Sequence, residues 1–126
     1  MDEWEQDRLE SFERRFKWHA KKRPKELEAT LKNLEKLFGG LQAGIGIRQL
    51  MAMHRFLHPE QAGVIAVDQK GGARNLAETR LYVFADEVDK VLYLITIGDK
   101  RTQADDVQFC KEFVDDLRKR RVDEQK

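Results

Sequence analysis

Five basic side chains in the second half of the chain lie at the ends of, or between, three stretches with strand composition. If these stretches pair as a meander, the basic side chains converge on one edge of the sheet. Lys and Arg there could hold RNA phosphates, and the ring of Tyr82, on the same strand face as Arg80, could stack on a base. Charges at strand ends are more often simply solvated, so that alternative stays open. The five basic residues are Lys70, Arg74, Arg80, Lys100 and Arg101.

No metal site and no cofactor are predicted. His54 and His58 are four residues apart and could share a helical face, as zinc ligands sometimes do. Only Glu60 lies near enough to add a ligand, and it follows Pro59, so helix-end histidines are the preferred interpretation. The glycines form neither a dinucleotide fingerprint nor a P-loop.

Composition sets bounds on location and partners. The 126 residues carry a net charge of only +1, so any nucleic-acid site has to be local. Cys110, the single cysteine, lies in an apolar stripe, which favours a buried thiol over a catalytic one. The first residues lack the pattern of a signal peptide, and the run Val91–Ile97 is too short to span a membrane. We therefore expect a cytoplasmic protein that does not bind membranes.

Apolar periodicity in the first half predicts helices. Residues 2–22 and residues 25–38 each carry an apolar stripe at three- and four-residue spacing. Gly39–Gly40 should end the second helix, and together the two form a helical hairpin. Residues 47–58 could form a third short helix that Pro59 closes.

After Pro59 the pattern changes to that of strands. Three stretches are rich in β-branched and aromatic residues, and the last of them is almost wholly apolar, as in a central strand covered on both faces. An apolar stripe then predicts a closing helix. The predicted strands are residues 63–69, 80–85 and 91–97, and the helix is residues 103–121.

These elements predict a single α+β domain over residues 1–126. In it the N-terminal helical hairpin, residues 2–38, packs on a short antiparallel β-sheet of about three to four strands. The sheet is built from residues 63–97, and the closing helix follows it.

The second half also resembles a known family. The run Glu78–Phe84, an acidic loop, the run Leu92–Gln103 and a helix beginning at Asp105 resemble the RelE/ParE/HigB toxin superfamily, and more narrowly its phage-associated HigB-like branch. Those proteins have an Arg-containing strand in a hairpin, then an apolar strand that ends in a Lys- and Gln-rich turn before a final helix. Their helical hairpin precedes the sheet.

The resemblance implies the toxin of a type II toxin–antitoxin pair. Such proteins enter the ribosome and cut mRNA without a metal, through attack of the ribose 2′-hydroxyl on the adjacent phosphate. Carried onto this chain, Arg80 would contact the scissile phosphate, and Lys100 and Arg101 would stabilise the transition state. Lys70, Arg74 and Tyr82 would bind RNA. The implied partners are an antitoxin protein, mRNA and the ribosome.

Two departures from the family leave alternatives open. Many members begin with a β-strand, whereas a helix is predicted here, and the final helix has no Tyr or His where several members place a catalytic group. A non-catalytic protein-binding module of the same fold, such as an inhibitor, is therefore the alternative. A third interpretation is a homodimer, in which Trp4 and Trp18, both off the apolar stripe, mark an exposed contact.

Overall fold

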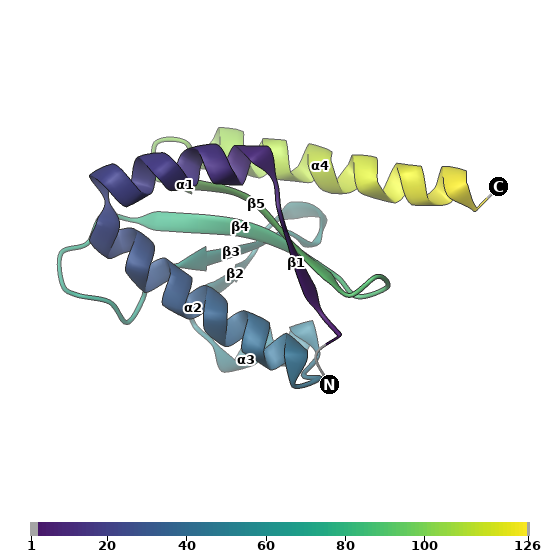
Figure 1. The fold of residues 1–126 in the computed structure, drawn as a ribbon, viewed down its shortest axis with the longest axis horizontal. Coiled ribbons are helices and arrows are strands. Elements are labelled where there is room, and N and C mark those ends of the chain that lie inside the picture. The colour runs from purple at the N-terminus through teal and green to yellow at the C-terminus, as the bar shows by residue number, and fades with distance from the viewer. Residues whose placement is uncertain (1–2, 126) are drawn as a thin grey trace.

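The computed structural model describes residues 3–125, an α+β fold built around a five-stranded mixed sheet (Figure 1). One short strand precedes three helices, four strands follow them, and a long helix closes the fold. The elements are β1 (Glu5–Arg8), α1 (Glu10–Lys22), α2 (Pro24–Gln42), α3 (Ile47–Met53), β2 (Leu57–Pro59), the 3-10 helix η1 (Gln61–Gly63), β3 (Ile65–Asp68), β4 (Thr79–Asp86), β5 (Val91–Asp99) and α4 (Gln103–Glu124).

The strand order in the sheet is β1-β5-β4-β3-β2. β1 runs parallel to β5, with Glu5 opposite Val91, and the other three pairings are antiparallel. A bulge shifts the register between β4 and β5, so that Tyr82 faces Thr96 while its neighbour Val83 faces Leu94. β1 and β2 are the edge strands of this order, so β5, β4 and β3 form the centre of the sheet.

Two cores lie on opposite faces of the sheet, because successive side chains of a strand point to opposite faces. The larger core packs α2 and α3 against one face, and the smaller core packs α4 against the other. Helix α1 runs along β5 beyond the end of β1, where Ser11 and Arg15 donate hydrogen bonds to the carbonyls of Ile95 and Ile97. These bonds satisfy backbone groups that no strand pairs there.

The predicted hairpin on a short antiparallel sheet of three to four strands is wrong, because the sheet begins with a strand at the N-terminus and has five mixed strands. All four side chains of β1 are exposed, so no apolar pattern marks it. Backbone pairing forms the strand instead: the N–H of Glu5 donates to Lys90 and that of Leu9 donates to Leu94, each at 3.0 Å. Helix α1 starts only at Glu10, and residue 2 of the predicted helix lies outside the described residues.

Two further boundaries differ from the prediction. Gly39 and Gly40 lie inside α2, which continues to Gln42, because helix–helix packing outweighs the low helix propensity of glycine. Helix α3 ends at Met53, and residues 57–59 form β2. The proline in β2 is compatible with a strand because β2 is an edge strand.

The predicted exposed contact through Trp4 is also wrong, because Trp4 is buried in the larger core, with the Lys90 ammonium 5.4 Å from the centre of its ring. The pairing of β1 with β5 carries Trp4 there. Trp18 remains 42% exposed.

The strands β3, β4 and β5 and helix α4 confirm four predicted elements, each within a few residues of its expected ends. The interior of β5 is buried on both faces, as its apolar run predicts. Cys110 is buried in the smaller core, and burial raises the pKa of its thiol to about 12, which confirms the packing interpretation.

Candidate functional site

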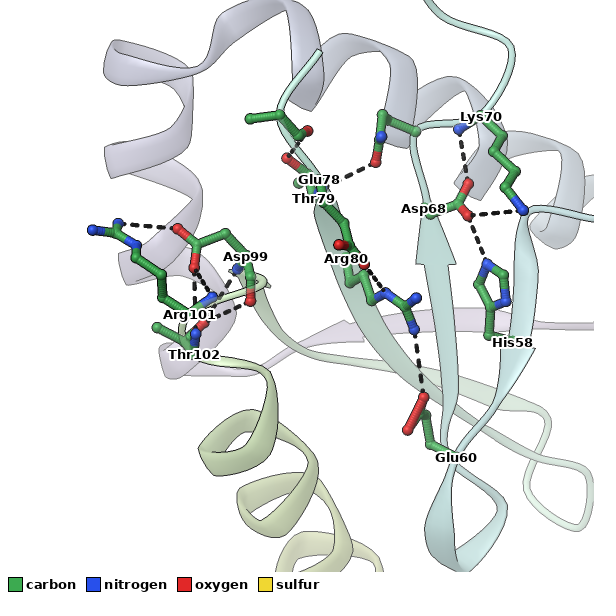
Figure 2. Close-up of polar contacts among 12 residues, drawn as sticks. His58, Glu60, Asp68, Lys70, Glu78, Thr79, Arg80, Asp99, Arg101 and Thr102 are labelled. Atoms are coloured by element: carbon green, nitrogen blue, oxygen red, sulfur yellow. Dashed lines mark hydrogen bonds and ion pairs between the residues drawn. The ribbon is translucent and has the colours of Figure 1, made fainter. Parts of the chain in front are cut away.

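Strands β2, β3 and β4 bring ionisable side chains to the sheet face that α4 covers in part. On this face Tyr82 packs against α4, whereas the positions nearer the strand ends are polar. The register pairs the backbone of Asp68 with that of Arg80, and the side chains form two pairs, His58 with Asp68 and Glu60 with Arg80. We call the four residues His58, Glu60, Asp68 and Arg80 the polar cluster (Figure 2).

His58 and Asp68 form the closest pair of the polar cluster, with 2.6 Å between His58 Nε2 and Asp68 Oδ2. The backbone N–H of Lys70 donates to the other carboxylate oxygen at 2.8 Å, which fixes the carboxylate. The side chain of Asp68 is 7% exposed and that of His58 is 26% exposed. A carboxylate accepts from Nε2–H, so Nδ1 is the nitrogen left to exchange a proton. The pair can therefore present an oriented imidazole to a ligand.

Arg80 lies between two carboxylates. Its Nε donates to Glu78 Oε1 at 3.0 Å, and its Nη1 lies 3.6 Å from Glu60 Oε1. The side chain of Arg80 is 20% exposed. Figure 2 shows the guanidinium pointing along the sheet toward Glu60. The contacts fix the position of the guanidinium, and they also balance its charge.

Lys100 and Arg101 lie in the turn between β5 and α4, beside the start of β4, where Thr79 faces Asp99. Arg101 Nη2 lies 3.1 Å from Asp99 Oδ2. Burial alone would raise the pKa of Asp99, but hydrogen bonds from the Arg101 side chain and from backbone N–H groups lower it. In Figure 2 the Arg101 guanidinium points away from Arg80. The structure thus brings the turn to the same end of the sheet as Arg80 but does not join their side chains.

The N-terminus of α4 holds this turn against the sheet through Asp106. The Thr102 hydroxyl donates to Asp106 Oδ2 at 2.6 Å, and Arg15 Nη2 lies 3.4 Å from Oδ1. Burial raises the pKa of the Asp106 carboxyl, and these two contacts oppose that effect. A Cβ on Gly98 would meet Asp106 Oδ2 at 1.8 Å, so only glycine lets α4 approach β5 this closely.

The three residues expected to bind RNA occupy different surroundings. Lys70 is exposed and adjoins the polar cluster, with its Nζ 3.9 Å from Asp68 Oδ2. Arg74 is exposed in the segment between β3 and β4. Tyr82 is 0% exposed, burial raises the pKa of its hydroxyl, and that hydroxyl has no hydrogen-bond partner among the described residues. The ring of Tyr82 therefore does not face solvent and cannot stack on a base in this conformation.

The polar cluster contains three residues that the sequence interpretation did not select: His58, Glu60 and Asp68. His58 was expected at a helix end, but only His54 lies there, stacked on Phe56. The sequence feature that could have indicated a strand here is the two-residue spacing of the polar residues His58 and Glu60, which puts both on one face of a strand. That signal is weak because β2 has only three residues.

Within residues 3–125, no three His, Cys, Asp or Glu side chains come together as a metal site would require. In the same part of the chain, no helix is long and apolar enough to cross a bilayer.

Comparisons with protein-family models, with curated proteins and with solved structures gave no significant match to this chain.

Proposed function

We propose that this protein is the toxin-like component of a toxin–antitoxin pair and cuts mRNA on the ribosome without a metal. The observation that carries the proposal is the polar cluster: Asp68 orients the imidazole of His58 and lies opposite Arg80 on the neighbouring strand. A proton-transfer group and a phosphate-binding group thus share one sheet face. RNA cleavage by the 2′-hydroxyl needs both.

Each group has a defined part in this reaction. His58, which Asp68 orients, takes the proton of the 2′-hydroxyl, whose oxygen then forms a bond to phosphorus. Arg80 stabilises the negative charge that develops on the phosphoryl oxygens. The bond from phosphorus to the 5′-oxygen breaks, and the leaving oxygen receives its proton from protonated His58. The products are a 2′,3′-cyclic phosphate and a 5′-hydroxyl.

The second support is the resemblance to the RelE/ParE/HigB superfamily. Many of its members begin with a β-strand, and β1 supplies that feature. Helix α4 still offers no Tyr or His, and the polar cluster supplies an alternative proton-transfer group on the sheet. Lys100 and Arg101, on the turn after β5, would bind neighbouring phosphates. In this proposal an antitoxin covers the polar cluster in the cytoplasm.

The test is induced expression in a bacterial host, with growth and mRNA 5′ ends followed together. The wild type should halt growth and create new, ribosome-dependent 5′ ends. His58→Gln should reduce cleavage about 100- to 10,000-fold, because Gln keeps an N–H donor for Asp68 but cannot move a proton. The double variant Arg80→Ala/Lys100→Ala should lose both effects.

Lys17→Ala/Lys21→Ala is the matched control, because both lysines are exposed on α1, away from the polar cluster. It removes the same positive charge and should remain toxic. Thermal melting of each purified variant checks that it folds. Normal growth with intact transcripts at good wild-type expression would refute the proposal.

One observation favours a second candidate, a non-catalytic protein-binding module. Arg80 and Arg101 are already paired with carboxylates of their own chain. Such pairing weakens their attraction for phosphate. A pull-down that recovers a stable protein partner but neither ribosomes nor RNA, together with a harmless wild type, would support this candidate.

A further inference from the structure

A basic groove of about 210 Å³ lies between α2 and the segment that connects β3 to β4. Four lysines line it, together with a single acidic residue, Glu28. The formal charges of these five side chains add up to +3, whereas the whole chain carries a net charge of +1, so positive charge is concentrated in the groove. The lysines of the basic groove are Lys25, Lys32 and Lys36 on α2 and Lys70 after β3.

Glycine sets the width of the basic groove. A Cβ on Gly72 would meet the Cβ of Ala29 at 2.7 Å, so the connecting segment lies this close to α2 only because Gly72 has no side chain. Asn33 of α2 holds the start of the same segment, donating from Nδ2 to the carbonyls of Asp68 and Lys70 at 2.9 Å each. The walls of the groove are therefore fixed by packing and by two hydrogen bonds, one of them buried.

The spacing of the lysines fits an extended polyanion. Lys25 and Lys36 are eleven residues apart on α2, which is about 16 Å along a helix axis. A single phosphate cannot span that length, whereas a nucleic-acid strand offers several phosphates over it. Lys32 pairs with Glu28 at 3.5 Å, but both side chains are well exposed, so the pair is weak and a phosphate can replace the carboxylate.

We propose that the basic groove binds the sugar-phosphate backbone of single-stranded RNA and guides it to the polar cluster, an inference that rests on the proposed function for the identity of the RNA as substrate. Continuity supports it. Lys70 is one of the residues that line the groove, and it also contacts Asp68 of the polar cluster, through its backbone N–H at 2.8 Å and its Nζ at 3.9 Å. Because α2 and the polar cluster lie on opposite faces of the sheet, a strand bound along α2 reaches the His58–Asp68 pair by passing round the end of β3 at Lys70.

The test measures binding without ribosomes, so that ribosome-dependent cleavage does not intervene. A short fluorescein-labelled single-stranded RNA is titrated with the full chain at several salt concentrations, and the dissociation constant is taken from fluorescence anisotropy. Lys25→Gln/Lys32→Gln/Lys36→Gln should lower the slope of log K against log salt by about 2, since each neutralised contact contributes about 0.7. If the plots of log K against log salt for the wild type and the triple variant meet at about 1 M salt, the variant binds RNA about 100-fold more weakly than the wild type at 0.1 M salt.

The matched control is Lys17→Gln/Lys21→Gln/Lys119→Gln, which removes the same charge from exposed positions outside the basic groove. It should keep the wild-type slope. Equal slopes for the groove variant and the control would overturn the inference, as would tighter binding of a polyglutamate of matched length, which would indicate an acidic protein segment instead. A wild type that binds RNA through the groove but does not cut it on ribosomes would refute only the proposed function.

Discussion

Alanine substitutions at the neighbouring glycines of α2 should have opposite effects on stability. A Cβ on Gly39 meets nothing within 4 Å, whereas a Cβ on Gly40 would meet Leu50 Cδ2 at 2.4 Å. Leu50 is 0% exposed, so a shift of its methyl group presses on other side chains of the close-packed core. Replacing glycine by alanine within a helix contributes about 0.5–1 kcal/mol at either position. Overpacking costs about 1–3 kcal/mol, and only Gly40→Ala incurs it.

The helix-propensity gain cancels when the two variants are compared, so their difference reports the overpacking alone. A chain of 126 residues shifts its Tm by about 4 °C per kcal/mol. Gly39→Ala should therefore melt about 2–4 °C above the wild type, and Gly40→Ala about 4–12 °C below Gly39→Ala. Differential scanning calorimetry measures both. A Gly39→Ala variant less stable than the wild type would refute the reasoning, because it would mean that α2 ends at Phe38 with glycine as its C-terminal cap.

Three further predictions concern buried polar groups. Asn33→Ala should cost about 1–3 kcal/mol in urea unfolding, because the buried hydrogen bond to the Asp68 carbonyl and a part-buried one to the Lys70 carbonyl lose their donor; a loss below the error of the measurement would contradict this. Burial alone would raise the pKa of Asp86, but hydrogen bonds from Arg121 and from the backbone lower it. The contribution of the ionised Asp86 to the free energy of unfolding is therefore fully present above the ordinary pKa of an aspartate. It is lost as the pH falls through the lowered pKa of the folded protein. Arg121→Met should be less stable than the wild type at neutral pH and should lose less stability than the wild type on acidification. A pH profile of stability equal to that of the wild type would contradict the stabilising role of the Arg121–Asp86 pair. Cys110, buried and with its pKa raised to about 12, should react with iodoacetamide only after unfolding, as mass spectrometry can show.

The candidate site shows where sequence reasoning reaches its limit. Arg80 is predicted as a site residue because it is a basic residue at a strand end and matches the Arg-containing strand of the resembled family, and the structure places it in the polar cluster. His58 and Asp68 were not selected, because each is an ordinary polar residue until β2 pairs with β3 and brings them within 2.6 Å. Tyr82 was selected for its ring, but α4 covers it. A contact between strands depends on register, and register depends on both partners.

The sequence by itself determined the elements that bury one side against a core. Periodic apolar residues identified α1, α2 and α4, and the apolar run of β5 predicted a strand buried on both faces. These patterns are local, because burial selects side chains at the period of the element.

Only the tertiary structure decided the two edge strands, the continuation of α2 past Phe38 and the composition of the polar cluster. The four residues of β1 are exposed, so their side chains carry no signal, and backbone hydrogen bonds to β5 make the strand. Gly39 and Gly40 remain helical although glycine disfavours a helix, because α3 packs against this end of α2. In each case the deciding interaction is with a residue of another element, so no side-chain pattern within the element encodes it.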